Sequence, residues 1–302
     1  MLALGGQAVI EGVMIKSPRY VTVAVRKGKS IKVKSTRFRS LAERNRIFGW
    51  PIIRGFAVFV EMLGAGFKAL NYSAEQAGEG KRMNRNETLI ATAIAVIMGL
   101  FLFVWLPYGL TSLMGLSERD SPLAFNLFDG IIKLAIFIIY IYLISLMDDV
   151  KRIFAYHGAE HKTVHCYEAG KKLTVTNVKR FSPIHLRCGT SFVLTVILIS
   201  VALFSLIPFA VKAIWPGVYG LSTLPRLGSM LLIRMIALMP IIAVSYEVLR
   251  ASSKAQDSIL TRTISYPGRL IQKLTTREPD NSQIEVAIAS VNEALRREGV
   301  SS

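Results

Sequence analysis

Four long apolar stretches constrain the fold of this chain more than any other feature. They cover about residues 88–116, 125–147, 191–215 and 230–249, and each is close to the ~20 apolar residues that a helix needs to cross a bilayer. The chain is 52% hydrophobic and has a mean hydropathy of +0.42, which favours a membrane protein over a soluble domain. The sequence therefore predicts an α-helical multi-pass membrane protein with four transmembrane helices.

Basic residues alternate between the segments that join these stretches. Sixteen Lys and Arg residues precede the first stretch, eight lie at 148–190 and eight follow residue 249, whereas the first and third loops hold one and two. The positive-inside rule then places both termini and residues 148–190 in the cytoplasm. It also explains the net charge of +17, for which attraction to nucleic acid or anionic lipid is an alternative explanation.

The first and last segments predict a small cytoplasmic α+β cap. Residues 1–48 alternate apolar and polar side chains around Gly28, which indicates a β-hairpin in a β-rich segment. Residues 172–176 offer another short strand. The tail, residues 251–302, contains the periodicity of an amphipathic helix at 281–299.

Residues 49–86 form a further unit, an amphipathic helix over a fifth apolar stretch followed by a basic linker. The helix is apolar over 50–71 except for Arg54, Glu61 and Lys68, which are seven residues apart and share one face. If it crossed the membrane, the 11 basic residues of 1–49 would face outward. We therefore expect an interfacial helix that lies in the membrane plane. The remaining units are 87–147 and 191–250, each with two transmembrane helices, and the loop 148–190.

Every histidine and every cysteine of the chain lies in this loop. They are His157, His161, His165, His185, Cys166 and Cys188. Such a concentration of imidazole and thiol groups indicates a metal site. We expect the second transmembrane helix to continue through the loop to about Ala169, where Gly170 ends it.

On that helix His157 and His161 are one turn apart, so both imidazoles can reach one ion. Glu160 lies between them on nearly the same face. The pattern His-x-x-Glu-His is that of the inverted zinc peptidases, in which the glutamate is the general base for water. It predicts Glu160 as a catalytic residue and a divalent metal, zinc, as the cofactor. An alternative role for Cys166 is that of a thiol nucleophile.

A third ligand must come from another segment, because His165 lies about 12 Å from His157 along a straight helix. His185 and Cys188 are the candidates, and either would complete an open, catalytic site. Alternatively, His161 and His165 join His185 and Cys188 in a closed, structural site. A further alternative is that these histidines are hydrogen-bonded core or interfacial residues without a metal.

Three motifs together resemble one known family. They are residues 5–14 (GGQAVIEGVM), 156–163 (YHGAEHKT) and 187–192 (RCGTSF). They resemble the YqhQ-like bacterial membrane proteins, catalogued as a domain of unknown function and labelled a predicted metal-dependent enzyme. The resemblance runs from residue 1 to about residue 275 and implies the bacterial cytoplasmic (inner) membrane. Leu186 stands where the family pattern has proline, but His185 and Cys188 are kept.

The resemblance draws attention to polar residues that could support the metal site. Gln7 and Glu11 lie in an otherwise apolar run, where they are candidates to bind or orient the ligands or to contact substrate. The alternative is that their segment is a turn that closes the cap. Arg187 and Glu168, beside the expected ligands, are assigned the same supporting role.

Charges also occur inside the apolar stretches. Asp129 and Lys133 are one turn apart in the second stretch, and Arg234 lies in the fourth. All three are expected near the outer membrane face, where long side chains reach water at little cost. We expect a structural pair, with a transport pathway as the alternative.

These observations favour a membrane-embedded, metal-dependent hydrolase whose site faces the cytoplasm. The alternative is a non-enzymatic assembly or docking factor whose metal only folds the cap. Its surface would be the basic run of Arg37, Arg39, Arg44 and Arg46, beside two phenylalanines, which suits ribosomal RNA or anionic lipid. Expected partners are membrane lipids, with the ribosome, other membrane proteins or a second copy of the chain as further alternatives.

Overall fold

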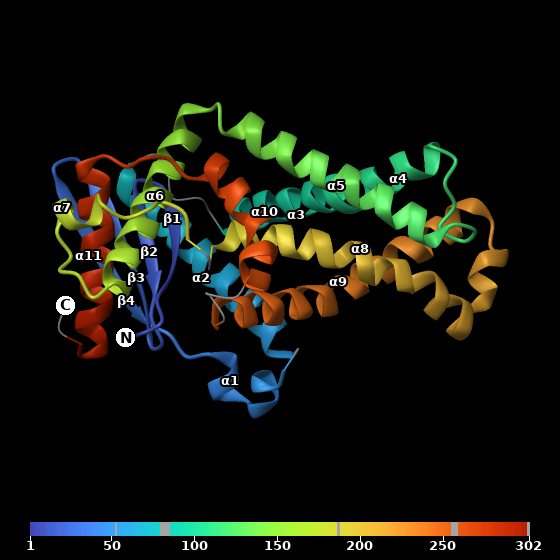
Figure 1. Cartoon of the computed structure of the whole chain (residues 1–302), viewed down its shortest axis with the longest axis horizontal. Helices are drawn as coiled ribbons and strands as arrows, with labels where there is room; N and C mark the ends of the chain where they lie inside the picture. Colours follow the sequence, from blue (N-terminus) through green and yellow to red (C-terminus); the bar gives the residue numbers. More distant parts are fainter. Residues whose placement is uncertain (52, 79–84, 186–187, 255–258, 301–302) are drawn as a thin grey trace.

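The computed structural model describes residues 1–51, 53–78, 85–185, 188–254 and 259–300. Figure 1 shows a bundle of long helices at one end of the molecule and a cap of strands and helices at the other. The cap contains both termini of the described chain, so the N-terminal strands and the last helix lie together.

The four apolar stretches all form helices that are long and apolar enough to cross a membrane. The helical segments are Leu89–Leu113, Pro122–Ile144, Gly189–Ile214 and Pro225–Ser252. The first combines α3 (Arg85–Leu100), a π-helical segment η2 (Phe101–Trp105) and α4 (Leu106–Leu113), and the others are α5 (Pro122–Ile144), α8 (Gly189–Ile214) and α9 (Thr223–Lys254). The predicted positions of the four helices are confirmed, while their insertion in a membrane and the cytoplasmic side of the termini stay predictions.

Charged residues inside the bundle point inward, which corrects the expectation that they reach water at the outer face. Arg234 is fully buried, 3.1 Å from Asp129 and 3.0 Å from Glu118, and Lys133 is ion-paired with Asp129. The aromatic rings of Tyr108 and Phe204 cover the guanidinium of Arg234. Burial of these charged side chains is possible because each lies next to a group of opposite charge.

The N-terminal strands form one antiparallel meander. Its strands, in spatial order, are β1 (Gly5–Val9), β2 (Gly12–Lys16), β3 (Tyr20–Lys27) and β4 (Ser30–Arg37). Gly28, with a φ of 57°, takes the first position of the two-residue turn between β3 and β4, a conformation that glycine adopts without strain. The predicted hairpin is confirmed as β3 and β4, and two further strands, β1 and β2, precede it in the same sheet.

The sheet is covered on both faces. On one face α6 (Asp148–Glu168) and α11 (Asn281–Glu298) pack on Val13, Ile15 and Ala24. On the other, α2 (Ile53–Ala77) packs on Met14 and Val23. Successive strand residues thus face opposite helices, as the two-residue repeat of a strand requires.

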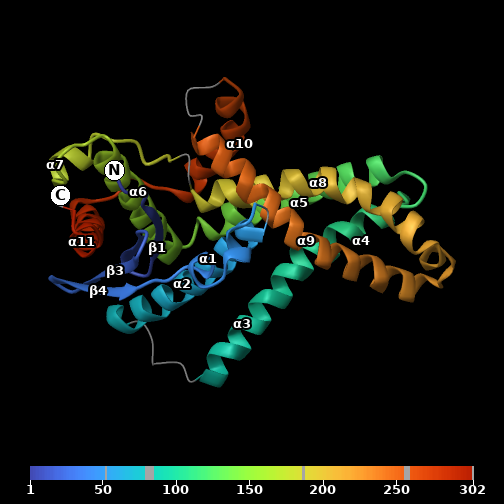
Figure 2. The ribbon, with the colours of Figure 1, turned by 90° about the horizontal axis from the view of Figure 1, so that it is seen from below.

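The helix α2 is present as predicted, and it connects the bundle to the cap. Gly55 lies so close to the backbone of Ala243 in α9 that a side chain would not fit, and Arg54 pairs with Glu247 at 2.5 Å. Figure 2 shows α2 running from the bundle toward the sheet. Whether it lies in a membrane interface stays a prediction.

Two local predictions about residues 145–178 are wrong. The second span does not continue into the loop, because α5 ends at Ile144 and α6 begins at Asp148. Arg277 donates to the carbonyl of Ser145 at 3.0 Å, which caps the end of α5. Residues 175–178 form the short helix α7 (Val175–Val178) instead of a strand, because the Thr174 side chain caps its first turn.

Three of the remaining helices lie near the sheet or at the end of the bundle next to the cap, and they are α1 (Leu41–Arg44), η1 (Arg46–Gly49) and α10 (Ile259–Thr275). The short helix η3 (Pro216–Gly220) lies at the opposite end of the bundle. The predicted amphipathic helix at 281–299 is confirmed as α11, with Ile284, Val286, Val291 and Leu295 buried. Its N-terminus has a capping box between Asp280 and Gln283.

Candidate metal centre

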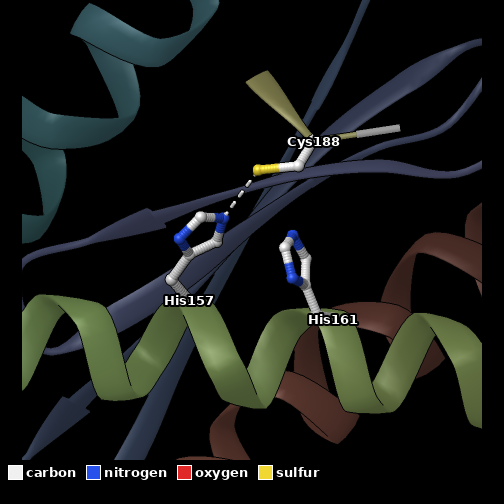
Figure 3. Close-up of side chains that lie close together, drawn as sticks. All are labelled: His157, His161 and Cys188. Carbon is white, nitrogen blue, oxygen red and sulfur yellow. Dashed lines mark hydrogen bonds between the residues drawn. The ribbon is translucent and has the colours of Figure 1, made fainter. Parts of the chain in front are cut away.

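Three side chains from two segments bring possible metal ligands together. His157 and His161 project from successive turns of α6, and Cys188 is the residue at which α8 begins. Their ligand atoms all lie within 4.8 Å of one another, with His157 Nε2 3.2 Å from Cys188 Sγ. Figure 3 shows the two rings and the sulfur directed toward a common point. We call these three residues the triad.

The hydrogen bonds of the two imidazoles fit metal binding. His157 Nδ1 donates to the carbonyl of Thr275 at 2.8 Å, and His161 Nδ1 donates to that of Pro183 at 2.6 Å. A proton fixed on Nδ1 leaves the lone pair of Nε2 free, and metal-bound histidines are commonly held in this way. The triad is therefore a candidate site for a divalent ion.

Burial sets the protonation states of His161 and Cys188. It holds the pKa of His161 well below the usual value, and the nearby His157 acts in the same direction, so the ring is neutral at pH 7. Burial also raises the pKa of the Cys188 thiol to about 11. A cation would have to displace that proton, which is the usual cost of thiolate coordination.

Glu160 is buried at the edge of the triad. One carboxylate oxygen lies 3.4 Å from His161 Nε2. On its other side the carboxylate meets Gly6 of β1, where any side chain on the strand would overlap it. The missing side chain of Gly6 thus makes room for an acid beside the triad, the position that a general base for water would need.

His165 and His185 form a separate group with Glu168. His165 Nδ1 donates to the carbonyl of Ser182 at 3.0 Å, and His185 Nε2 lies 3.2 Å from a Glu168 oxygen. The two rings are tilted by 34° to each other, with centroids 4.4 Å apart. Among the described residues, neither ring joins the triad, so the closed four-ligand arrangement is not formed.

The structure places Glu11 and Gln7, two of the predicted supporting residues, away from the triad. Glu11, in the turn between β1 and β2, is ion-paired with Arg152 and accepts from Tyr156 at 3.2 Å. Gln7 faces the opposite side of the sheet, where it meets Gly66 of α2. Their segment is thus a turn that fastens the sheet to α6 and α2, which was the alternative interpretation. Arg187 lies outside the described residues.

A glutamine that sequence reasoning missed holds His185 and Ser191, which lie on either side of Cys188 in the sequence. Gln272 of α10 is fully buried, accepts from the His185 backbone N–H and donates to the His185 carbonyl, both at 2.8 Å. Its amide also donates to Ser191 Oγ at 2.8 Å. Together with the Thr275 carbonyl, this makes α10 the scaffold of the site. A single glutamine in a helix gives no sequence signal for such a role.

The four predicted surface arginines lie on the far side of the sheet from the triad. Arg37 ends β4, Arg39 follows it, Arg44 ends α1 and Arg46 begins η1, and all are exposed.

Comparison with known proteins identifies the family. The sequence model of the family described as "Protein of unknown function (DUF1385)" matches residues 50–297. The chain belongs to the DUF1385 family. A relative in this comparison, the "Uncharacterized protein YqhQ" of Bacillus subtilis (strain 168), is 34% identical over 318 residues, which cover 99% of this chain and 94% of that protein. The resemblance predicted from three motifs is confirmed. The DUF1385 match includes the triad, Gln272 and nearly all of α11 but starts after the Gly5–Met14 motif. No solved structure matches the chain.

Proposed function

We propose that this protein is a membrane-embedded, metal-dependent hydrolase whose site faces the cytoplasm. His157, His161 and Cys188 would hold one divalent ion, for which zinc is the best match to two imidazoles and a thiolate. The observation that carries the proposal is the convergence of three ligand atoms within 4.8 Å, with both histidine Nδ1 atoms already committed to carbonyls. Three protein ligands leave a coordination position for water or substrate, as in catalytic zinc sites.

Glu160 supplies the second part of the proposed mechanism. A bound ion would polarise the substrate carbonyl or phosphoryl oxygen and lower the pKa of water. Glu160 would take the proton from the attacking water and return it to the leaving group, and the carbonyls of Thr275 and Pro183 would keep the imidazoles in position. Substrates that reach this depth are lipid head groups, peptides next to the membrane and small cytosolic esters.

The first test is metal content, measured by elemental mass spectrometry on the detergent-purified protein. We expect about one equivalent in the wild type and in Glu160→Gln, and almost none in the His157→Ala/His161→Ala variant. His165→Ala is the matched control, because it removes an imidazole of α6 that lies outside the triad. Glu160→Gln should keep the metal and lose hydrolysis of fluorogenic ester and amide substrates.

Three other outcomes would count against the proposal in different ways. Metal that survives the double substitution would move the site to His165, His185 and Cys188 and favour a structural role. Metal that is lost in Glu160→Gln would make this residue a ligand instead of a base. If the wild type holds no metal after reconstitution with zinc, the proposal of a metal-dependent hydrolase is excluded.

A further inference from the structure

A groove lies on the opposite face of the sheet from α6 and the triad. It has a volume of about 930 Å³ and is bounded by β3, the end of β4, α1 and one side of α2. Its apolar wall consists of Val21 and Val23 of β3 with Val60, Ala65 and Ala69 of α2. A helix that packed along its whole length on the sheet would leave no such space, so α2 and the sheet diverge here.

The rim of the groove is strongly basic. It carries Lys34, Arg37, Arg39, Arg44 and Lys68. Two acids also line it, which leaves a net charge of +3, and one of them, Glu61, accepts from the Leu41 backbone N–H. Within the described part of the chain, none of the five basic residues forms an ion pair. The rim therefore suits an anion that comes from outside the protein.

An exposed apolar stripe continues from the groove along α2. The stripe consists of Ile53, Val60, Leu63, Phe67 and Leu70, which are spaced three, four or seven residues apart and so share one side of the helix, and each residue is between 38% and 57% exposed. Val60 belongs to both the stripe and the groove wall. A basic pocket that opens directly on an apolar helix face matches a ligand with an anionic head and hydrocarbon chains.

We propose that this groove binds an anionic phospholipid. The head-group phosphate would lie against Arg37, Arg39 and Arg44, and the acyl chains would leave the groove past Val60 along the stripe. RNA is the less suitable ligand, because the two rings that line the groove are each covered on one face by a lysine: Lys16 Nζ lies over Phe38 at 4.4 Å and Lys34 Nζ over Tyr72 at 4.9 Å.

The lipid site is independent of the proposed hydrolase site. The sheet separates the two, since Gly6 and Ala8 face α6 whereas Gln7 and Val9 face α2. The bound lipid is therefore not the substrate of the triad. Metal content serves as the internal control, because groove variants should leave it unchanged.

The experiment measures lipid binding by native mass spectrometry on the full-length, delipidated protein, with dioleoyl phosphatidylglycerol and dioleoyl phosphatidylcholine. The charge variant is Arg37→Gln/Arg39→Gln/Arg44→Gln. Its matched control is Lys27→Gln/Lys29→Gln/Lys32→Gln, which removes the same charge from the exposed end of the β3–β4 hairpin. The steric variant is Gly64→Phe, which keeps every charge, and a Cβ at Gly64 meets nothing within 4 Å.

We expect phosphatidylglycerol to bind the wild type and the hairpin control equally. Binding should be about a hundredfold weaker in the charge variant, because each of the three basic residues contributes about fivefold to anionic-lipid attraction. Gly64→Phe should weaken it as well, at unchanged thermal stability. Equal binding of phosphatidylcholine, or undiminished binding in both groove variants, would overturn the proposal.

Two further experiments distinguish the phospholipid from other anionic ligands. Glycerol phosphate that competes as well as the lipid would show a free-phosphate site and contradict the role of the apolar stripe. A ribosomal RNA fragment that binds the wild type and Gly64→Phe but not the charge variant would replace the lipid by nucleic acid.

Discussion

Gly6 of β1 lies against the carboxylate of Glu160 in α6, so closely that no side chain fits between strand and acid. These two residues are 154 positions apart, and each belongs to a motif that resembles the same family. Their contact joins the edge of the sheet to the triad and explains why the N-terminal motif needs glycine at this position.

Substitution of Gly6 by alanine should therefore displace Glu160. We expect a loss of about 1–3 kcal/mol in the free energy of unfolding, since the added methyl group overpacks a buried contact. Thermal unfolding followed by circular dichroism measures it. The neighbouring Gly5→Ala is the control, because a Cβ there meets no atom within 4 Å and should change stability by less than about 0.5 kcal/mol. Equal effects of the two substitutions would contradict the contact.

Metal removal should loosen the junction between α6 and α8. An ion that binds only the folded state at a free concentration 100 times its dissociation constant adds about 2.7 kcal/mol to stability. Addition of a chelator should lower the unfolding temperature of the wild type but not of Cys188→Ser, whose triad is already incomplete. If neither zinc nor chelator changes the unfolding temperature of the wild-type protein, the proposed metal site is contradicted.

Arg234 should be the charge on which the bundle depends most. Arg234→Met leaves Glu118 without its guanidinium partner and Asp129 with Lys133 alone, and loss of one partner of a buried ion pair typically costs about 3–5 kcal/mol. Arg119→Gln, in the exposed loop at the same end, should cost less than about 0.5 kcal/mol. Unfolding in detergent by guanidinium compares the two, and equal midpoints would show that the cluster contributes nothing.

The capping box of α11 should fix the start of this helix. Asp280→Ala removes the acceptor for the Gln283 N–H and should cost about 1 kcal/mol. Hydrogen exchange should rise in the first turn of α11. Ser282→Ala serves as the control, because this hydroxyl donates to Asp280 but does not cap the backbone, and its exchange should remain near that of the wild type.

The sequence predicts the elements of this fold better than their connections. Apolar length identifies the four bundle helices, and alternation around Gly28 identifies the hairpin, because both signals are local. The same signals could not show that α5 stops at Ile144, since the reason is a hydrogen bond from Arg277, far along the chain. Arg234 was expected near water for a similar reason: its partner Glu118 lies in a loop whose position only the packed bundle determines.

For the candidate site, too, the sequence predicts the local arrangement but not the contacts between distant segments. Spacing alone placed His157 and His161 on one side of a helix, and it also excluded His165 from their ion. It could not choose between His185 and Cys188, because that choice depends on how Gln272 holds the segment before α8. The carbonyls of Thr275 and Pro183 have no signal in a sequence, since every residue carries such a group.

The position of α11 has a consequence for biosynthesis. The face of the sheet that packs on α6 is also covered by α11, a helix that follows all four bundle helices in the chain. The strands are synthesised first, yet their partner leaves the ribosome only after the last bundle helix has been made. The triad-bearing face of the cap can therefore mature only after α11 has been made, so that a product truncated before α11 would carry the ligands without the fold that supports them.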